Sequence, residues 1–296
     1  MAYIEVKDLV RVYRMGDVEV RALRGLNMSV REGELVSVMG PSGSGKTTLL
    51  NILGGLDRAT AGDAKVGDVD VTFLDRRQLV MYRRRVVGHI FQTLNLVPTL
   101  SAAENIALPM IVNQISKSDR RSRIDELLEI VQLTDRRKHK PDELSGGEQQ
   151  RVAIAAALAN DPPIILADEP TGELDSETSK VIVDFLVEIN KSYNKTTILV
   201  THNPIVAAAT ERILRIDDGV IKAAYTPAEL ESGAEGRTVS YVDQMRQRIK
   251  KLNTELANLD EKFRKGDVDG DEYVEERLRL KAAIRGLEDE VHRHGG

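Results

Sequence analysis

The sequence predicts an α/β fold with a mostly parallel central sheet, and two patterns indicate it. Short runs of branched apolar residues alternate along the chain with segments of helical periodicity. Several of these runs are apolar almost without interruption, which is typical of strands covered on both faces. Because strands that alternate with helices usually form parallel sheets, we expect one α/β domain over residues 1–228.

The predicted elements follow one another in a regular order. The expected strands are Tyr3–Val6, Leu35–Met39, Val86–Phe91, Ile164–Ala167, Thr197–Thr201 and Ile213–Ile216. The expected helices include Thr48–Leu53, Ser118–Gln132, Gly147–Asn160 and Ser176–Ser192. In Ser118–Gln132, for example, apolar residues recur at the three- and four-residue spacing of one helix face.

The remainder of the chain has a different pattern. Residues 229–240 contain two glycines and few large apolar residues, so we expect a linker there. Residues 241–296 then carry two apolar seams separated by a turn. The seams predict an antiparallel helical hairpin of coiled-coil type, and they consist of Val242, Met245, Ile249, Leu252, Leu256, Leu259 and Phe263, and of Tyr273, Leu280, Ile284, Leu287 and Val291.

The composition is that of an ordinary globular protein. The chain has 296 residues, of which 41% are apolar and 30% charged, so global disorder is excluded. It has no cysteine, which excludes disulfides and thiolate zinc sites and favours a reducing, cytoplasmic setting. We expect neither a signal peptide nor a span of the ~20 apolar residues that cross a bilayer. Since 42 basic and 47 acidic residues give a net charge of −5, no nucleic-acid partner is expected.

A phosphate-binding loop follows the strand Leu35–Met39. The segment Gly40-Pro-Ser-Gly-Ser-Gly-Lys-Thr47 fits the pattern GxxxxGK[ST] between a strand and a helix, which is the setting that the pattern requires. Its backbone N–H groups and the helix N-terminus favour a bound phosphate. We expect Lys46 to reach the β- and γ-phosphates and Thr47 to ligate Mg²⁺. The binding residues are Gly40, Ser42, Gly43, Ser44, Gly45, Lys46, Thr47 and Thr48.

Two acidic residues come directly after another buried strand. Asp168 and Glu169 follow Ile164–Ala167, so they lie at the carboxyl edge of the sheet, where nucleotides bind. An aspartate at that edge can hold Mg²⁺. Because side chains alternate along a strand, Glu169 points to the opposite face and is expected to orient or deprotonate an attacking water.

A second glycine motif, Leu144-Ser-Gly-Gly-Glu-Gln-Gln-Arg151, opens the helix Gly147–Asn160. Ser145 and Glu148 have the spacing of a capping box, so the motif can be an ordinary helix start. A flexible Ser-Gly-Gly at a helix N-terminus is also an anion site. Two such termini in one chain require either two ligands or one ligand shared between chains.

In this order, the phosphate loop, the Leu-Ser-Gly-Gly-Glu motif and the Asp-Glu pair resemble the nucleotide-binding subunits of ATP-binding cassette (ABC) transporters over about residues 1–225. The resemblance implies a phosphate-loop NTPase fold with a helical subdomain that carries the signature motif. It also implies a head-to-tail dimer of two copies, in which ATP lies between the phosphate loop of one copy and Ser145, Gly146 and Gly147 of the other.

The resemblance assigns roles to further residues. Tyr13 occupies the position of the aromatic residue that stacks on adenine. Gln92 matches the glutamine that contacts Mg²⁺ and water and senses the membrane partner, and Asp175 matches the aspartate that couples the two sites. His202 matches the histidine that contacts the γ-phosphate. The implied catalytic residues are Glu169, His202 and Lys46, and the implied metal ligands are Thr47, Gln92 and Asp168.

Within the superfamily, the chain is most similar to the lipoprotein-releasing and macrolide-exporter class, on segments such as Tyr13-Arg-Met-Gly16 and Ala167-Asp-Glu-Pro-Thr-Gly172. This implies an ATP-hydrolysing subunit with ATP and Mg²⁺ that drives integral membrane permease subunits docked near Gln92–Met110. Such a subunit is peripheral, on the cytoplasmic face of the membrane. Export, or extraction of lipids, lipoproteins, peptides or drugs, is the implied direction, and the permease sets the substrate.

Two alternatives remain. The first is a soluble ABC ATPase that acts on the ribosome or on DNA, although such proteins usually carry two cassettes or a long coiled coil between loop and signature, and neither is present. The second is a regulatory ATPase whose hairpin binds a partner. The resemblance does not explain the hairpin, whose seams can pack on each other, pair between subunits or dock a partner helix.

Overall fold

The computed structural model divides into two compact units, Met1–Arg237 and Thr238–Gly296. The division falls inside the predicted linker 229–240, whose first residues belong to the short helix α8, Pro227–Glu231. The two-residue strand β11, Arg237–Thr238, lies at the division itself. The structure describes residues 2–16, 18–172, 174–231, 237–238, 241–265 and 269–294.

The central sheet of the first unit has the strand order β10-β9-β3-β8-β7-β6. The pairs from β9 to β6 are all parallel, and β10 pairs antiparallel with β9. The mostly parallel sheet predicted from the sequence is therefore confirmed. Its strands are β3 (Leu35–Met39), β6 (Val87–Ile90), β7 (Ile164–Asp168), β8 (Thr196–Thr201), β9 (Arg212–Asp217) and β10 (Val220–Tyr225).

Strand β7 shows why the strand sequences are apolar throughout. Ile164 and Leu166 belong to one hydrophobic core, whereas Ile165 and Ala167 belong to another on the opposite face of the sheet. All four side chains are buried. A strand enclosed on both faces needs apolar residues at every position, and its end brings Asp168 to the edge of the sheet.

A second, antiparallel sheet has the order β2-β1-β4-β5, and the sequence predicted only a fragment of it. Strand β1 runs over Ala2–Met15, where only Tyr3–Val6 was expected. It pairs with β2 (Val18–Arg31) on one side and with β4 (Ala61–Val66) on the other. The first four residues of β2 are exposed. Because charged residues interrupt these strands, they lack the apolar runs that reveal buried strands. The remaining strand is β5, Val69–Asp70.

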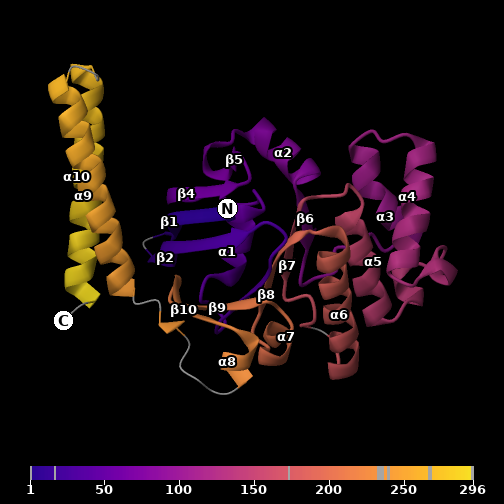
Figure 1. Cartoon of the computed structure of the whole chain (residues 1–296). Helices are drawn as coiled ribbons and strands as arrows, with labels where there is room; N and C mark the ends of the chain where they lie inside the picture. The colour runs from indigo at the N-terminus through magenta and orange to yellow at the C-terminus, as the bar shows by residue number, and fades with distance from the viewer. Residues whose placement is uncertain are drawn as a thin grey trace. The chain divides into compact units, whose positions relative to one another are not determined.

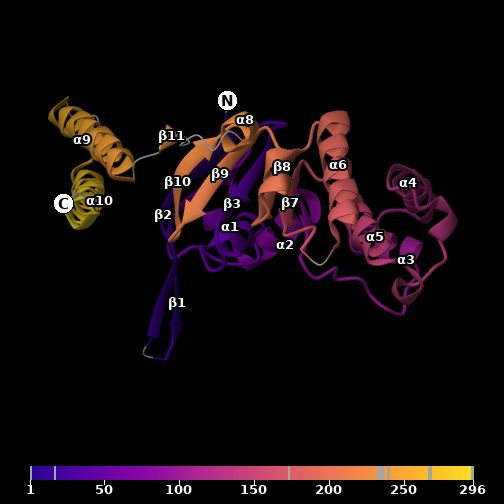
Figure 2. The same cartoon turned by 90° about the horizontal axis from the view of Figure 1, so that it is seen from below.

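Helix α1 (Lys46–Leu53) starts at the phosphate loop and lies between the two sheets (Figure 2). Its buried residues Leu49, Leu50 and Leu53 join the core that both sheets share. The loop before α1 is therefore held by the best-packed part of the unit.

The helices around the signature motif form a group of their own (Figure 1). Helices α3 (Ala102–Val112), α4 (Lys117–Ile130) and α5 (Gly146–Leu158) share the second core. The predicted helices there end within two residues of the observed ones. The other helices of the unit are α2 (Arg76–Arg85), α6 (Ser176–Tyr193) and α7 (Pro204–Ala208), with 3-10 turns at Val71–Phe73, Thr134–Arg136 and Pro141–Glu143.

The second unit consists of helices α9 (Tyr241–Lys265) and α10 (Gly270–His294), which pack on one another. Leu252, Leu280 and Ile284 are buried between them. The side chains of Val242 and Met245 lie outside the described part of the structure. Across the described residues, no helix combines the length and the apolar character that a membrane span requires.

Candidate active site

Backbone carbonyl oxygens of the phosphate loop bind the ammonium group of Lys46. The Nζ of Lys46 donates hydrogen bonds of 2.9 Å to the carbonyl oxygens of Gly40 and of Pro41. Gly45 has a φ of 102°, a left-handed conformation that residues with a side chain rarely adopt. Helix α1 begins at the next residue. The loop therefore holds an ammonium group and the N-terminal amides of a helix in one small volume, which suits a polyphosphate.

Two further observations concern the space and the polar groups of the loop. A Cβ on Gly40 would lie 2.1 Å from the carbonyl oxygen of Ile216, so the loop has no room for a larger residue there. The hydroxyl oxygen of Ser44 is buried and has no hydrogen-bond partner. A buried donor without a partner is costly, and an oxygen-rich ligand in the loop would satisfy it.

Two of the three residues expected to hold Mg²⁺, Thr47 and Asp168, meet at the edge of the central sheet. The Thr47 hydroxyl donates a 3.2 Å hydrogen bond to Oδ1 of Asp168. Burial raises the pKa of Asp168 above its usual range, despite the hydrogen bond from Thr47. Burial makes the charged form of this carboxylate costly, and a divalent cation bound beside it would offset that cost. One carboxylate and one hydroxyl fit Mg²⁺, which takes its other ligands from phosphates and water.

Glu169 and His202 are joined to each other. The Nδ1 of His202 lies 2.9 Å and 3.0 Å from the two carboxylate oxygens of Glu169. Only 11% of the Glu169 side chain is exposed, against 67% of the His202 side chain. Glu169 has a φ of 45° and its N–H donates to the carbonyl oxygen of Val200. The left-handed turn at Glu169 therefore directs successive carboxylates apart, one to Thr47 and one to His202.

The signature motif begins α5 as the sequence predicted. Ser145 caps the helix by accepting a hydrogen bond from the N–H of Glu148, whose carboxylate accepts from the N–H of Ser145. A Cβ on Gly147 would lie 2.4 Å from Cγ2 of Thr178. Thr178 in turn donates to both carboxylate oxygens of Asp175, which lowers the pKa of Asp175. The two motifs expected to face a second copy are thus in contact within one chain.

Gln92 lies beside the turn that carries Glu169. Its Nε2 is 3.7 Å from the position that a Cβ would take on Gly172. The N–H of Gly172 donates to the carbonyl oxygen of Glu169. Gln92 and Glu169 therefore both lie beside Gly172.

Tyr13 is held by two residues that the sequence did not single out. Its hydroxyl donates a 2.7 Å hydrogen bond to Asp57, and the guanidinium of Arg11 lies 4.4 Å from the centre of its ring. Arg11 and Asp57 also form an ion pair. Because 44 residues separate Asp57 from Tyr13, no local sequence pattern indicates this cluster.

A phosphate loop, a hydrogen-bonded Asp–Thr pair and a Glu–His pair at the edge of one parallel sheet define a nucleotide-hydrolysing enzyme of the phosphate-loop class. A family model described as ABC transporter matches residues 23–172. The chain belongs to the ABC transporter family, as its ATP-binding and ATP-hydrolysing subunit, with Mg²⁺ as the cofactor.

Relatives of known sequence cover nearly the whole first unit. The chain is 47% identical over 223 residues to an uncharacterised ABC transporter ATP-binding protein, MJ0796, of Methanocaldococcus jannaschii, covering 74% of this chain and 95% of that protein. It is 45% identical over 238 residues to the macrolide export ATP-binding/permease protein MacB of Syntrophobacter fumaroxidans, covering 80% of this chain and 32% of that protein.

A solved structure agrees with both. The dimeric structure of a post-hydrolysis state of the MJ0796 cassette, bound to ADP and Pi, has a TM-score of 0.70 and 44% sequence identity, and the match covers 76% of this chain and 98% of that one. The predicted family and fold are therefore confirmed, and these relatives give no support to a role on the ribosome or on DNA.

Proposed function

We propose that two copies of the chain enclose two ATP molecules head to tail and thereby drive permease subunits in a membrane. Each pocket combines the phosphate loop of one copy with Ser145, Gly146 and Gly147 of the other. The two helix N-termini, of α1 and α5, support this proposal, because the positive end of a helix dipole attracts an anion at each of them. The dimeric, ADP-bound relative supports it as well.

Within each pocket the side chains divide the work of hydrolysis. Lys46 binds the β- and γ-phosphates, while Thr47, Asp168 and Gln92 hold Mg²⁺. The metal neutralises charge on the transferring phosphoryl group. Glu169 accepts a hydrogen bond from the attacking water and aligns it, and His202 contacts the γ-phosphate while it holds the Glu169 carboxylate in place. Asp175 links the two pockets through the contact of Thr178 with Gly147.

The observation that carries this mechanism is the 2.9 Å contact between Nδ1 of His202 and the carboxylate of Glu169. Glu169 directly follows Asp168, whose carboxylate accepts the hydrogen bond from Thr47. It is tested by Glu169→Gln, which keeps the shape but removes the basic oxygen. We expect this variant to bind ATP, to lose turnover and to accumulate as an ATP-bound dimer in size-exclusion chromatography with light scattering.

The matched control is Glu188→Gln, which makes the same chemical change at an exposed position of α6. It should hydrolyse ATP at the normal rate and should not trap a dimer. Normal turnover by Glu169→Gln would show that Glu169 is not the catalytic acid–base residue.

The permease contact and the cellular location belong to the same proposal. We place the subunit on the cytoplasmic face of the membrane, attached through permease subunits near Gln92–Met110. The similarity to a macrolide export ATP-binding/permease protein supports export or extraction as the direction of transport. Purification of the chain from membranes with its bound subunits tests this, since recovery without any multi-span protein would contradict it.

The hairpin is proposed as a separate extension of the cassette, with the cassette over 1–228, the linker over 229–240 and the hairpin over 241–296. The burial of Leu252, Leu280 and Ile284 supports a hairpin that packs on itself. A role in regulation would then come from its outer surface, where Val274 and Leu278 are 54% and 65% exposed.

A further inference from the structure

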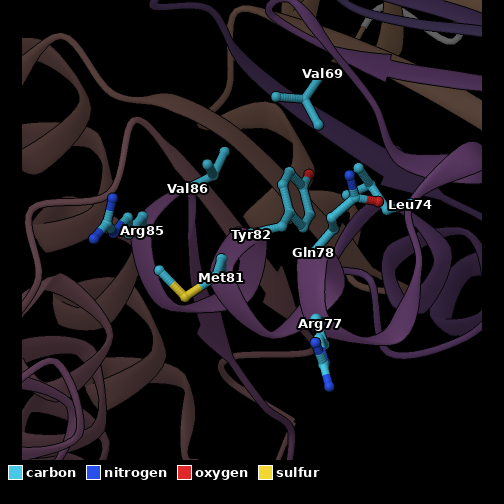
Figure 3. A pocket seen from close by; sticks show the side chains of 8 residues that line it. All are labelled: Val69, Leu74, Arg77, Gln78, Met81, Tyr82, Arg85 and Val86. Atoms are coloured by element: carbon cyan, nitrogen blue, oxygen red, sulfur yellow. The ribbon is translucent and has the colours of Figure 1, made fainter.

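Helix α2 borders an apolar hollow that the catalytic site does not use. The hollow has a volume of about 410 Å³ and lies between α2, the end of the antiparallel sheet and the start of β6. Figure 3 shows Met81 at its edge, with Arg77 and Arg85 on either side. The residues that line it are Val69, Leu74, Arg77, Gln78, Met81, Tyr82, Arg85 and Val86.

The hollow is a rigid feature of the fold. The Tyr82 hydroxyl donates a 2.7 Å hydrogen bond to the carbonyl oxygen of Leu53, at the end of α1. The guanidinium of Arg83 donates to the carbonyl oxygen of Gly55. At the other end of α2, Asp75 and Gln78 form a capping box. The helix is therefore held near both of its ends, so the hollow exists before any ligand arrives.

The charged residues that line the hollow are both arginines. Helix α2 contains five arginines and no acidic residue, although the chain as a whole has a net charge of −5. Within the described residues, none of the five forms an ion pair with a carboxylate. Asp70 and Asp75, the acids just before the helix, accept hydrogen bonds from groups of their own turns. Arg77 and Arg85, which line the hollow, thus remain available to an acidic partner.

The spacing of the arginines defines what the partner presents. Arg77, Met81 and Arg85 recur every four residues, so they share one face of α2. At 1.5 Å per residue, the two arginines are about 12 Å apart along the helix, with an apolar residue midway. A second helix laid along α2 matches this face when it carries two carboxylates eight residues apart and a large apolar side chain between them.

We propose that this hollow docks an acidic amphipathic helix of a protein partner, its apolar side chain in the hollow and its carboxylates on Arg77 and Arg85. This proposal rests on the proposed function, in which the ATP-binding subunit drives a partner protein. It adds a second contact with such a partner, outside Gln92–Met110. A concave surface favours a protruding side chain of a protein over the flat surface of a lipid layer.

The test measures binding of a defined probe to the full chain. The probe is a fluorescein-labelled, alanine-based helical peptide with a central leucine and a glutamate four residues before and after it. Fluorescence anisotropy should show binding that Arg77→Glu weakens about threefold to tenfold, the range expected for reversal of one partly exposed ion pair. Arg76→Glu is the matched control, since its side chain is exposed on the same helix but does not line the hollow.

A charge exchange makes the test specific. The double variant Arg77→Glu, Arg85→Glu should bind a peptide with lysines in place of the glutamates better than the unchanged chain does. ATP hydrolysis by these variants stays normal, so failure here is distinct from failure of the catalytic proposal.

Three results would overturn the proposal. They are absence of peptide binding, equal binding of glutamate and glutamine peptides, and equal effects of Arg76→Glu and Arg77→Glu. If instead the chain sediments with vesicles of phosphatidylcholine and phosphatidylglycerol through Arg77 and Arg85, without binding the peptide, the surface binds lipid and the proposal is wrong.

Discussion

Glu169 holds a backbone conformation that should cost stability, and the cost can be measured. Its φ of 45° lies in the left-handed region, where a Cβ is crowded by the following carbonyl oxygen. We therefore expect Glu169→Gly to be more stable than Glu169→Ala. Both variants lose the contact with His202 and the carboxylate, so the comparison isolates the backbone.

The size of the difference follows from two opposing effects. The left-handed conformation costs a residue with a Cβ about 1–2 kcal/mol. Glycine gains more freedom in the unfolded chain, which offsets roughly 0.4–1 kcal/mol. The glycine variant should therefore be about 0.5–1 kcal/mol more stable, which corresponds to a melting temperature ~1–4 °C higher for a domain of this size.

Thermal unfolding of the two variants, followed by far-UV circular dichroism, measures this difference. The matched control is the same pair of substitutions at Glu188, inside helix α6, where glycine should be about 1 kcal/mol less stable than alanine. The reasoning is refuted if Glu169→Ala is as stable as Glu169→Gly while the pair at Glu188 behaves normally. Both variants at Glu169 should have lost ATP hydrolysis.

Two further predictions concern contacts within the first unit. Burial lowers the pKa of His89 to about 4, so its neutral form is favoured in the folded chain, and stability should fall as the pH drops from about 6.5 to about 4. His89→Phe keeps the stack on Phe91 but has no group that titrates. Its free energy of unfolding, from urea titrations, should therefore fall less between these two pH values, by at most about 3 kcal/mol. Gly147→Ala places a Cβ against Thr178 and should lower ATP hydrolysis, which Thr178→Ser should partly restore by removing the methyl group. Unchanged hydrolysis in Gly147→Ala would show that Thr178 can move away from the added Cβ without loss of activity.

The sequence was sufficient wherever a residue's role depends on its immediate neighbours. The phosphate loop, the capping box at Ser145 and the position of Asp168 at the end of β7 all follow from short segments whose patterns dictate a backbone shape. The central strands were equally visible, because enclosure on both faces demands continuous apolar residues. The family resemblance then supplied roles for His202 and Gln92 that no local pattern carries.

The sequence was insufficient where structure depends on residues far apart. Most of the antiparallel sheet went unpredicted, because β1 and β2 pair through their backbones and carry charged side chains on their exposed positions. The cluster of Arg11 and Asp57 around Tyr13 forms only after this sheet folds. The hollow beside α2 also needs three separate segments and is a property of shape.

The cluster around Tyr13 has a consequence for how tightly a base can bind. With its hydroxyl on Asp57 and Arg11 over one face, the ring has lost its rotational freedom in the free protein. Under the role that the resemblance implies for Tyr13, a purine stacked on the opposite face would meet a ring already held in place, so binding would not have to order this side chain. Because a flat ring recognises any aromatic base, the platform should add affinity while discriminating weakly between adenine and guanine.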